Sequence, residues 1–214
     1  GPGFMPGRAG GHHHRTFKFP SSPTGIPRYA SEGMRGIYVA AVTPWTPGGQ
    51  VQEAVLEQHV EMLLAAGVDG ICVGGSTGEF PRLEIAERQR LLGAVLKIAR
   101  GRAPVIAGVG HASLVGTLAR VGAAEGAAAV VVPPPYYFPY GQPELLAFYR
   151  QVAAASELPV LIYNIPQFTS GLEPPTAVEL LAGGTCAGIK DSSGRLEMLE
   201  ALAAERRRRP FVLF

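Results

Sequence analysis

One lysine stands at the end of an apolar run and is followed at once by turn residues. The stretch 188–194, GIKDSSG, predicts the end of a short buried strand, one lysine, and a turn into a helix. At a strand exit, partial desolvation can supply the neutral amine that attacks carbonyl carbons. Lys190 is therefore a candidate nucleophile. The alternative is a lysine whose stem lies on apolar surface while its ammonium stays in solvent.

A second group of polar residues follows an earlier apolar run. Residues 74–79, GGSTGE, offer the hydroxyls of Ser76 and Thr77 and several backbone N–H groups that glycine leaves unhindered. The segment precedes a predicted helix N-terminus, which suits a small anion such as a carboxylate. Glycine, serine and threonine also form ordinary turns. The segment lacks the spacing of a Walker loop, so a nucleotide is not expected.

Tyrosines stand at two further candidate positions. Tyr163 ends an apolar run and leads into Asn164-Ile165-Pro166, and Tyr136 and Tyr137 follow three consecutive prolines. A phenol beside an amine can transfer protons. Tyrosine near a strand more often packs in a core or at its rim, so both readings remain open from the residues alone.

Apolar runs and helical patterns alternate along the chain and must position these residues. The expected strand and helix pairs are 37–42 with 51–66, 71–73 with 83–100, 104–109 with 114–124, 127–132 with 143–155, 159–162 with 176–182, and 186–189 with 196–204, followed by a strand at 211–214. Strands that are apolar throughout must be covered on both faces. The pattern therefore predicts a parallel sheet with crossover helices.

Two α/β folds share this alternation. A doubly wound sheet binds its ligand at one switch point, whereas a β/α barrel gathers the loops after all its strands at one rim. Distinctive polar residues follow several of the predicted strands, so several loops are expected to share one site. We predict a TIM (β/α)8 barrel, truncated after about six βα units and the start of the seventh strand, because a whole barrel needs about 250 residues. The sequence is then expected to be a fragment or a product that cannot close its barrel.

The first 33 residues differ in composition from the remainder. Glycine, proline, arginine and serine dominate residues 1–33, which lack the continuous apolar region of a secretory signal. We expect a disordered N-terminal extension there and a catalytic domain over residues 34–214. His12, His13 and His14 have no cysteine or acidic residue nearby, so no metal site is expected.

Composition excludes some partners. The 47% hydrophobic content allows one buried core, and the net charge of +2 indicates neither nucleic acid nor a membrane surface as a partner. The basic run 206–209 suits a solvated helix end. Cys72 and Cys186 lie in apolar runs and predict no disulfide, which fits a cytoplasmic protein.

Four segments together show a family resemblance. They are GSTGE at 75–79, PYY at 135–137, YNIP at 163–166 and GIKD at 188–191. In order and spacing they resemble the dihydrodipicolinate synthase and N-acetylneuraminate lyase family of class I, pyruvate-handling aldolases. The resemblance runs from residue 34 to the C-terminus, and the combination is more specific than any one segment.

The resemblance implies a role for each matching residue. Lys190 would form a Schiff base with the C2 carbonyl of pyruvate or another 2-oxo acid, without any cofactor. Ser76 and Thr77, with backbone N–H groups such as that of Gly75, would hold the substrate carboxylate. Tyr163 would relay protons. Tyr137 matches a tyrosine that reaches into a neighbouring subunit's site, which implies a homodimer or homotetramer.

One departure from the family pattern narrows the substrate. Synthases that condense pyruvate with aspartate semialdehyde usually carry an arginine two residues after the proline of the YNxP motif, and here that residue is Phe168. An apolar ring cannot clamp a carboxylate. A 2-oxo-3-deoxy sugar acid or a related 2-oxo acid is therefore the expected substrate. The alternatives are the true synthase reaction and a non-catalytic relative that binds a 2-oxo acid.

Overall fold

A computed structural model describes residues 34–214 as one parallel sheet with helices between its strands. The strands are β1 (Tyr38–Ala40), β2 (Gly70–Val73), β3 (Val105–Gly108), β4 (Ala129–Val132), β5 (Val160–Asn164), β6 (Gly188–Asp191) and β7 (Val212–Leu213). The helices are α1 (Glu53–Ala65), α2 (Ile85–Ala99), α3 (Leu114–Gly122), α4 (Gln142–Ala155), α5 (Pro174–Ala182) and α6 (Leu196–Arg208), with a short 3-10 helix at Phe80–Arg82. The extension predicted at 1–33, with its three histidines, lies outside the described residues and stays a prediction.

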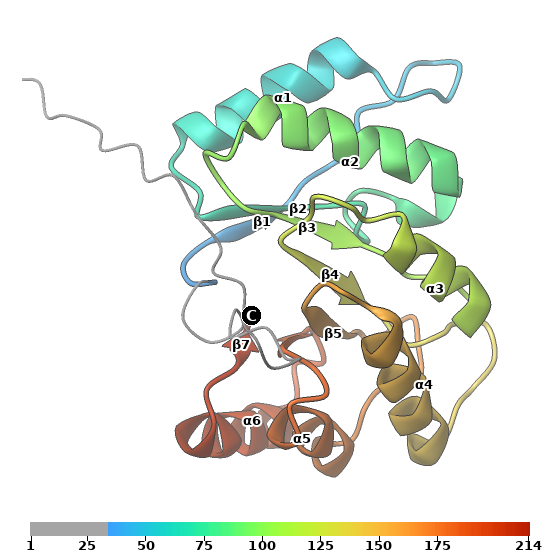
Figure 1. The fold of residues 1–214 in the computed structure, drawn as a ribbon, viewed down its shortest axis with the longest axis vertical. Coiled ribbons are helices and arrows are strands. Elements are labelled where there is room, and N and C mark those ends of the chain that lie inside the picture. Colours follow the sequence, from blue (N-terminus) through green and yellow to red (C-terminus); the bar gives the residue numbers. More distant parts are fainter. Residues whose placement is uncertain (1–33) are drawn as a thin grey trace, which may run out of the picture.

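The strand order distinguishes the two candidate folds. Each strand pairs in parallel with the next strand along the chain, in the order β1 to β7 without a reversal. A doubly wound sheet needs a reversal of strand order, whereas a barrel adds its strands in sequence. The helices lie in an arc around one face of the curled sheet (Figure 1). The prediction of a partial (β/α)8 barrel is thereby confirmed.

The two outermost strands leave the sheet open. Within the described residues β1 and β7 each have one strand neighbour, so the ring of hydrogen bonds is not closed. The rings of Tyr38, on β1, and Phe214, just after β7, lie with their centroids 4.9 Å apart. An aromatic contact therefore joins the two edge strands where backbone pairing does not.

Local signals explain where several helices begin. At the start of α2 the Glu84 N–H donates to the Glu87 carboxylate over 2.9 Å, in a capping box. At the start of α3 the Ser113 hydroxyl accepts the Gly116 N–H over 3.2 Å. Proline occupies the first turn of α4 and α5, where its missing N–H costs nothing. These capping residues and prolines determine where α2, α3, α4 and α5 begin.

The sheet separates two apolar cores because side chains alternate along each strand. One core fills the space between the sheet and the helices and includes Val105, Val130 and Ile189. The other lies on the concave face of the sheet and includes Ile106 and Val131. We call these the outer core and the inner core. Residues two apart on a strand therefore share a core, and direct neighbours do not.

The predicted elements are all present, with changes at their ends. The predicted sixth strand ends at Ile189, whereas β6 continues through Lys190 to Asp191. It continues because the Asp191 N–H donates to the Phe214 carbonyl over 2.9 Å, so pairing with the last strand persists past the lysine. The basic run 206–209 is exposed at the end of α6, as predicted.

Three negative findings concern residues 34–214 alone. None of their helices is long and apolar enough to cross a membrane. Nowhere in this part of the chain do three or more histidine, cysteine, aspartate or glutamate side chains gather as a metal site would require. Both cysteines are free. The cytoplasmic location stays a prediction.

Candidate functional site

Lys190 and Tyr163 are direct neighbours on adjacent strands. They are register partners in the parallel pair β5 and β6, and the Lys190 Nζ lies 4.2 Å from the centroid of the Tyr163 ring. An ammonium over an aromatic face is held by a cation–π interaction. Tyr163 is only 6% exposed and belongs to the inner core, while Lys190 is partly buried. The pair therefore stands on the concave face, at the carboxyl ends of its strands.

Cys72, on β2, interacts electrostatically with Lys190, on β6. It lies on β2 and packs against the inner core. Burial raises the pKa of the Cys72 thiol to about 11, and the charge of Lys190 opposes that rise. The Lys190 amine therefore acts electrostatically on β2, the strand that leads into the glycine-rich segment. The sequence alone indicates only that Cys72 is a small buried hydrophobe.

Residues 74–79, directly after β2, form a hydrogen-bonded turn that carries the hydroxyls of Ser76 and Thr77. The Glu79 N–H donates to the Ser76 carbonyl over 3.0 Å, and the buried Thr43 hydroxyl donates to the Gly78 carbonyl over 2.8 Å. Ser76 and Thr77 are exposed, and neither hydroxyl has a hydrogen-bond partner within residues 34–214. The turn stands at the carboxyl end of its strand, as Lys190 does. Its two hydroxyls are available to a ligand.

Close backbone packing sets the position of this turn. A Cβ at Gly108, on β3, would overlap the carbonyl of Gly74 at the start of the turn. A Cβ at Gly75 would lie 3.8 Å from the Cys72 sulfur. The turn therefore rests directly on β3 and on the strand that it leaves, with Gly108 allowing the closest approach.

Asn164 and Asp191 directly follow the tyrosine and the lysine, and they too are register partners. The Asn164 side-chain amide donates to the Asp191 carboxylate over 2.7 Å. Asn164 has no exposed surface, and its side-chain oxygen accepts the Leu172 N–H over 3.0 Å. Because alternate residues face opposite ways, this pair lies behind the Tyr163 and Lys190 pair, on the other face of the strands.

Two predicted site residues lie at the surface. Tyr137 is 86% exposed and has a φ of 86°, and its ring meets that of Phe138 edge-on with centroids 4.8 Å apart. Positive φ is uncommon for a residue with a side chain. Phe168 is 74% exposed in the loop between β5 and α5. Neither side chain is part of a core formed by residues 34–214.

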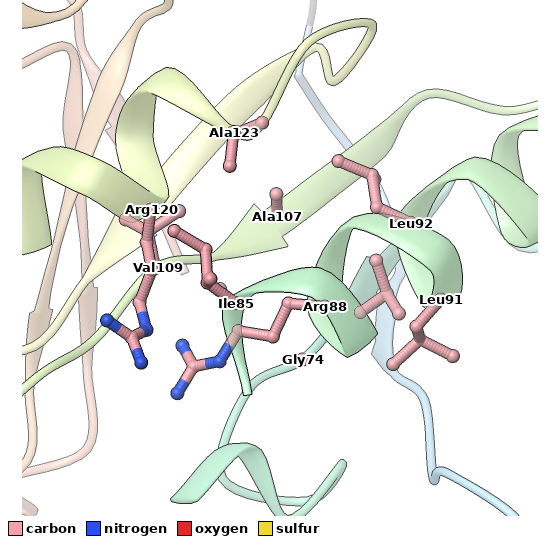
Figure 2. A pocket seen from close by; sticks show the side chains of 12 residues that line it. Gly74, Ile85, Arg88, Leu91, Leu92, Ala107, Val109, Arg120 and Ala123 are labelled. Carbon is pink, nitrogen blue, oxygen red and sulfur yellow. The ribbon is translucent and has the colours of Figure 1, made fainter. Parts of the chain in front are cut away.

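A small cavity lies on the other face of the sheet. It is bounded by β2, β3, α2 and α3, and the guanidinium groups of Arg88 and Arg120 lie beside its apolar walls (Figure 2). Its volume is about 20 Å³, which is room for about one water molecule. Arg88 donates to the carbonyls of Leu83, Gly110 and Phe80. Burial, and then the charge of Arg120, lower the pKa of Arg88 to about 10. Arg88 therefore binds three backbone carbonyls here, and the cavity is too small for a substrate.

Fold and site together define a parallel β/α-barrel protein with a lysine and tyrosine pair inside its carboxyl rim. A family profile described as the dihydrodipicolinate synthetase family matches residues 33–214. The chain belongs to this family, as the resemblance of its motifs predicted. The family comprises aldolases and lyases.

Curated relatives show the same membership. The chain is 40% identical over 175 residues to 4-hydroxy-tetrahydrodipicolinate synthase of Thermomicrobium roseum, covering 79% of this chain and 57% of the relative. It is 35% identical over 171 residues to N-acetylneuraminate lyase of Rhizobium meliloti, with the same two coverages. The chain thus spans under three fifths of the length of these relatives.

Solved structures share the fold. Dihydrodipicolinate synthase from Thermotoga maritima has a TM-score of 0.81 at 31% identity, covering 86% of this chain and 64% of its own. The 2-keto 3-deoxygluconate aldolase from Picrophilus torridus has a TM-score of 0.78 at 28% identity, covering 84% and 65%. A prophage protein of the family from E. coli K12, solved with pyruvate, has a TM-score of 0.79 at 29% identity, covering 84% and 62%.

Proposed function

We propose that this protein is a class I aldolase or lyase that joins or separates pyruvate and an aldehyde through a Schiff base on Lys190. The observation on which this rests is the Lys190 Nζ held 4.2 Å from the Tyr163 ring centroid on the concave face of the sheet. An amine and a phenol at this spacing supply a nucleophile and a proton carrier in one place. No cofactor is needed, because the imine itself accepts electrons.

The proposed cleavage proceeds through a covalent imine between Lys190 and the 2-oxo acid. The neutral amine of Lys190 attacks C2 of the 2-oxo acid, and loss of water with uptake of one proton leaves a protonated imine. Tyr163 relays the proton removed from the C4 hydroxyl as the C3–C4 bond breaks. The aldehyde leaves, and the bond electrons remain as an enamine. The proton taken from the C4 hydroxyl is returned to C3 of the enamine, and hydrolysis of the protonated imine then releases pyruvate, the proton taken up in the first step and the neutral amine. Condensation is the reverse sequence.

The substrate carboxylate is assigned to the turn after β2. The exposed hydroxyls of Ser76 and Thr77 have no hydrogen-bond partner there among residues 34–214, and the backbone N–H of Gly75 is the proposed third donor. A 2-oxo acid with its carboxylate on this turn would direct C2 into the concave face, where Lys190 lies. Pyruvate bound to the related prophage protein from E. coli K12 supports this class of ligand.

Trapping tests the proposed function directly. Pyruvate with borohydride should reduce the imine to a stable adduct on Lys190, which peptide mass mapping locates. Release of pyruvate from a panel of 2-oxo-3-deoxy acids should identify the substrate. An adduct on another residue would contradict the assignment of Lys190, and so would no adduct at all. Binding without an adduct would favour the non-catalytic alternative.

Replacing Tyr163 with phenylalanine separates imine formation from proton transfer. The ring that contacts the Lys190 ammonium remains and only the hydroxyl is lost. We therefore expect the borohydride-trapped adduct to persist while kcat falls by about 10²- to 10⁴-fold, the usual contribution of a general acid or base. Steady-state kinetics and adduct mass, measured on the same preparation, check this. Equal losses of adduct and of kcat would contradict a separate proton-relay role.

Because Phe168 stands where an arginine is expected, we predict that this protein is a poor dihydrodipicolinate synthase. An exposed ring replaces the cation that would hold a second carboxylate, so condensation of pyruvate with aspartate semialdehyde should be slow. Phe168→Arg should raise kcat/KM for this condensation by about 10-fold, as one charge-assisted hydrogen-bonding group allows. A coupled assay compares both proteins at low semialdehyde concentration. Efficient condensation by the unaltered protein would show that another cation binds the semialdehyde and would favour the synthase alternative.

A homodimer or homotetramer is the proposed assembly. Tyr137 is exposed and held at positive φ, and it forms an aromatic pair with Phe138, which is also exposed. Aromatic side chains of this kind are enriched at protein interfaces. Contact with a second copy would bring the Tyr137 phenol out of solvent. Light scattering of the native protein measures the assembly.

A further inference from the structure

We propose that Asn164 and Asp191 form a clasp that positions Tyr163 and Lys190 for the reaction. This inference rests on the proposed Schiff-base function. Each clasp residue directly follows one of the reacting residues, and the two pairs occupy consecutive register positions of β5 and β6. The clasp therefore joins the two strands at the point where both reacting side chains leave them.

The hydrogen bonds of Asn164 define the first half of the clasp. Its amide N–H donates to Asp191 Oδ1 over 2.7 Å, and its amide oxygen accepts the Leu172 N–H over 3.0 Å. The opposite amide orientation would face oxygen with carboxylate and N–H with N–H, so only one orientation satisfies both partners. A hydrogen bond to a carboxylate is stronger than one between neutral groups. Asn164 thus ties β5 both to β6 and to its own following loop.

The hydrogen bonds of Asp191 define the second half. Its Oδ2 accepts the Ser193 hydroxyl over 2.8 Å, and the Ser193 oxygen accepts the Arg195 N–H over 3.2 Å, at the start of α6. The Ser192 N–H also donates to the Asn164 backbone carbonyl over 2.8 Å. The loops after β5 and β6 are therefore both fixed to one pair, the buried Asn164 amide and the partly buried Asp191 carboxylate.

This arrangement indicates that Asn164 and Asp191 position the reacting side chains and do not themselves contact the substrate. The clasp side chains lie on the opposite face of the strands from Lys190 and Tyr163. They hold the strand ends whose orientation decides where the amine and the phenol point. A displacement of about 1 Å between reacting groups can cost about 10²-fold in rate. Asn164 and Asp191 are positioning residues in this sense.

An exchange of the two side chains tests the clasp. Asn164→Asp places two carboxylates against each other, so the strand ends should separate, and we expect kcat to fall about 100-fold while the trapped Lys190 adduct persists. Asn164→Asp combined with Asp191→Asn restores the pairing in reverse. The carboxylate at position 164 then accepts the Leu172 N–H and the amide of position 191, whose oxygen still accepts the Ser193 hydroxyl. We expect kcat of the double variant to return to within about 10-fold of the unaltered protein.

Two further variants keep the test decisive. Asp191→Asn alone retains an amide-to-oxygen hydrogen bond without charge, so it serves if Asn164→Asp does not fold, with an expected loss in kcat of about 10-fold. Gln142→Ala is the matched control. Its amide also ties the β5–α5 loop, by donating to the Gly171 carbonyl and accepting the Glu173 N–H, but it does so from α4 without contacting β6. It should lower the melting temperature and leave kcat unchanged.

The outcomes separate the clasp from the proposed function. Absence of a Lys190 adduct in the unaltered protein would overturn the proposed function. If that adduct forms but the clasp variants lose only melting temperature, as the control does, the positioning role is wrong. Failure of the folded double variant to recover kcat would overturn it as well. Recovery in the double variant, with adduct retained throughout, supports the clasp.

Discussion

Lys190→Ala is expected to lose imine formation and turnover together. Within residues 34–214, Lys190 supplies the amine of the proposed site that an imine requires, and alanine leaves the Tyr163 ring and the turn after β2 without it. We expect kcat to fall by at least about 10³-fold, because removal of a covalent nucleophile costs more than removal of a binding group. Borohydride trapping should give no pyruvate adduct on any peptide.

Lys97 provides the matched control. It is exposed on α2, on the helix side of the sheet, and Lys97→Ala removes an amine of the same type without touching the concave face. This variant should keep both adduct and turnover. Substantial pyruvate release by Lys190→Ala, with an unchanged melting temperature, would show that the reaction does not need the amine.

Gly108→Ala is expected to displace the turn that carries Ser76 and Thr77. The added Cβ would overlap the Gly74 carbonyl, and two backbone segments cannot part as a flexible side chain would. We expect a loss of about 1–3 kcal/mol in the free energy of unfolding, as for other overpacked sites. The KM for the 2-oxo acid should rise about 10-fold or more, because the proposed carboxylate seat moves relative to Lys190.

Denaturant unfolding and steady-state kinetics on the same variant check this expectation. Gly93→Ala is the control, since a Cβ at Gly93 on α2 meets no atom within 4 Å. Alanine is the better helix former, so that variant should gain about 0.5–1 kcal/mol of stability and keep its KM. A Gly108→Ala protein with unchanged stability and KM would show that the turn does not depend on β3.

The sequence predicted most of the fold because each element carries its own local signal. Apolar runs of three to six residues, bounded by turn residues, predict the strands, and their alternation with helical patterns predicts the parallel sheet. The local pattern predicts that the sixth strand ends at Ile189, directly before Lys190, whereas β6 continues to Asp191. Pairing with β7 extends that strand, and pairing depends on residues more than twenty positions away. Local patterns do not contain that information.

In the candidate site, too, features with a local signal were predictable from the sequence, whereas contacts between distant segments were not. Lys190 and Tyr163 were singled out from their positions at strand ends and from their motifs, and the register of β5 with β6 places them in contact. The proximity of Cys72 to Lys190 and the close approach of Gly108 to Gly74 were not predicted. Both depend on how strongly the sheet curls, which no short segment specifies. The catalytic roles of all these residues stay proposals.

Because successive residues of each strand alternate between the outer and the inner core, an insertion within a strand would exchange the side chains of the two cores. Within β6, Ile189 packs toward the helices and Lys190 toward the concave face. One residue added before Lys190 would turn the amine into the outer core and an apolar side chain into the site. The same addition beside the exposed Gly101, between α2 and β3, would change only a surface turn. Length variation compatible with the chemistry is therefore confined to the loops, whereas the strands admit substitution only.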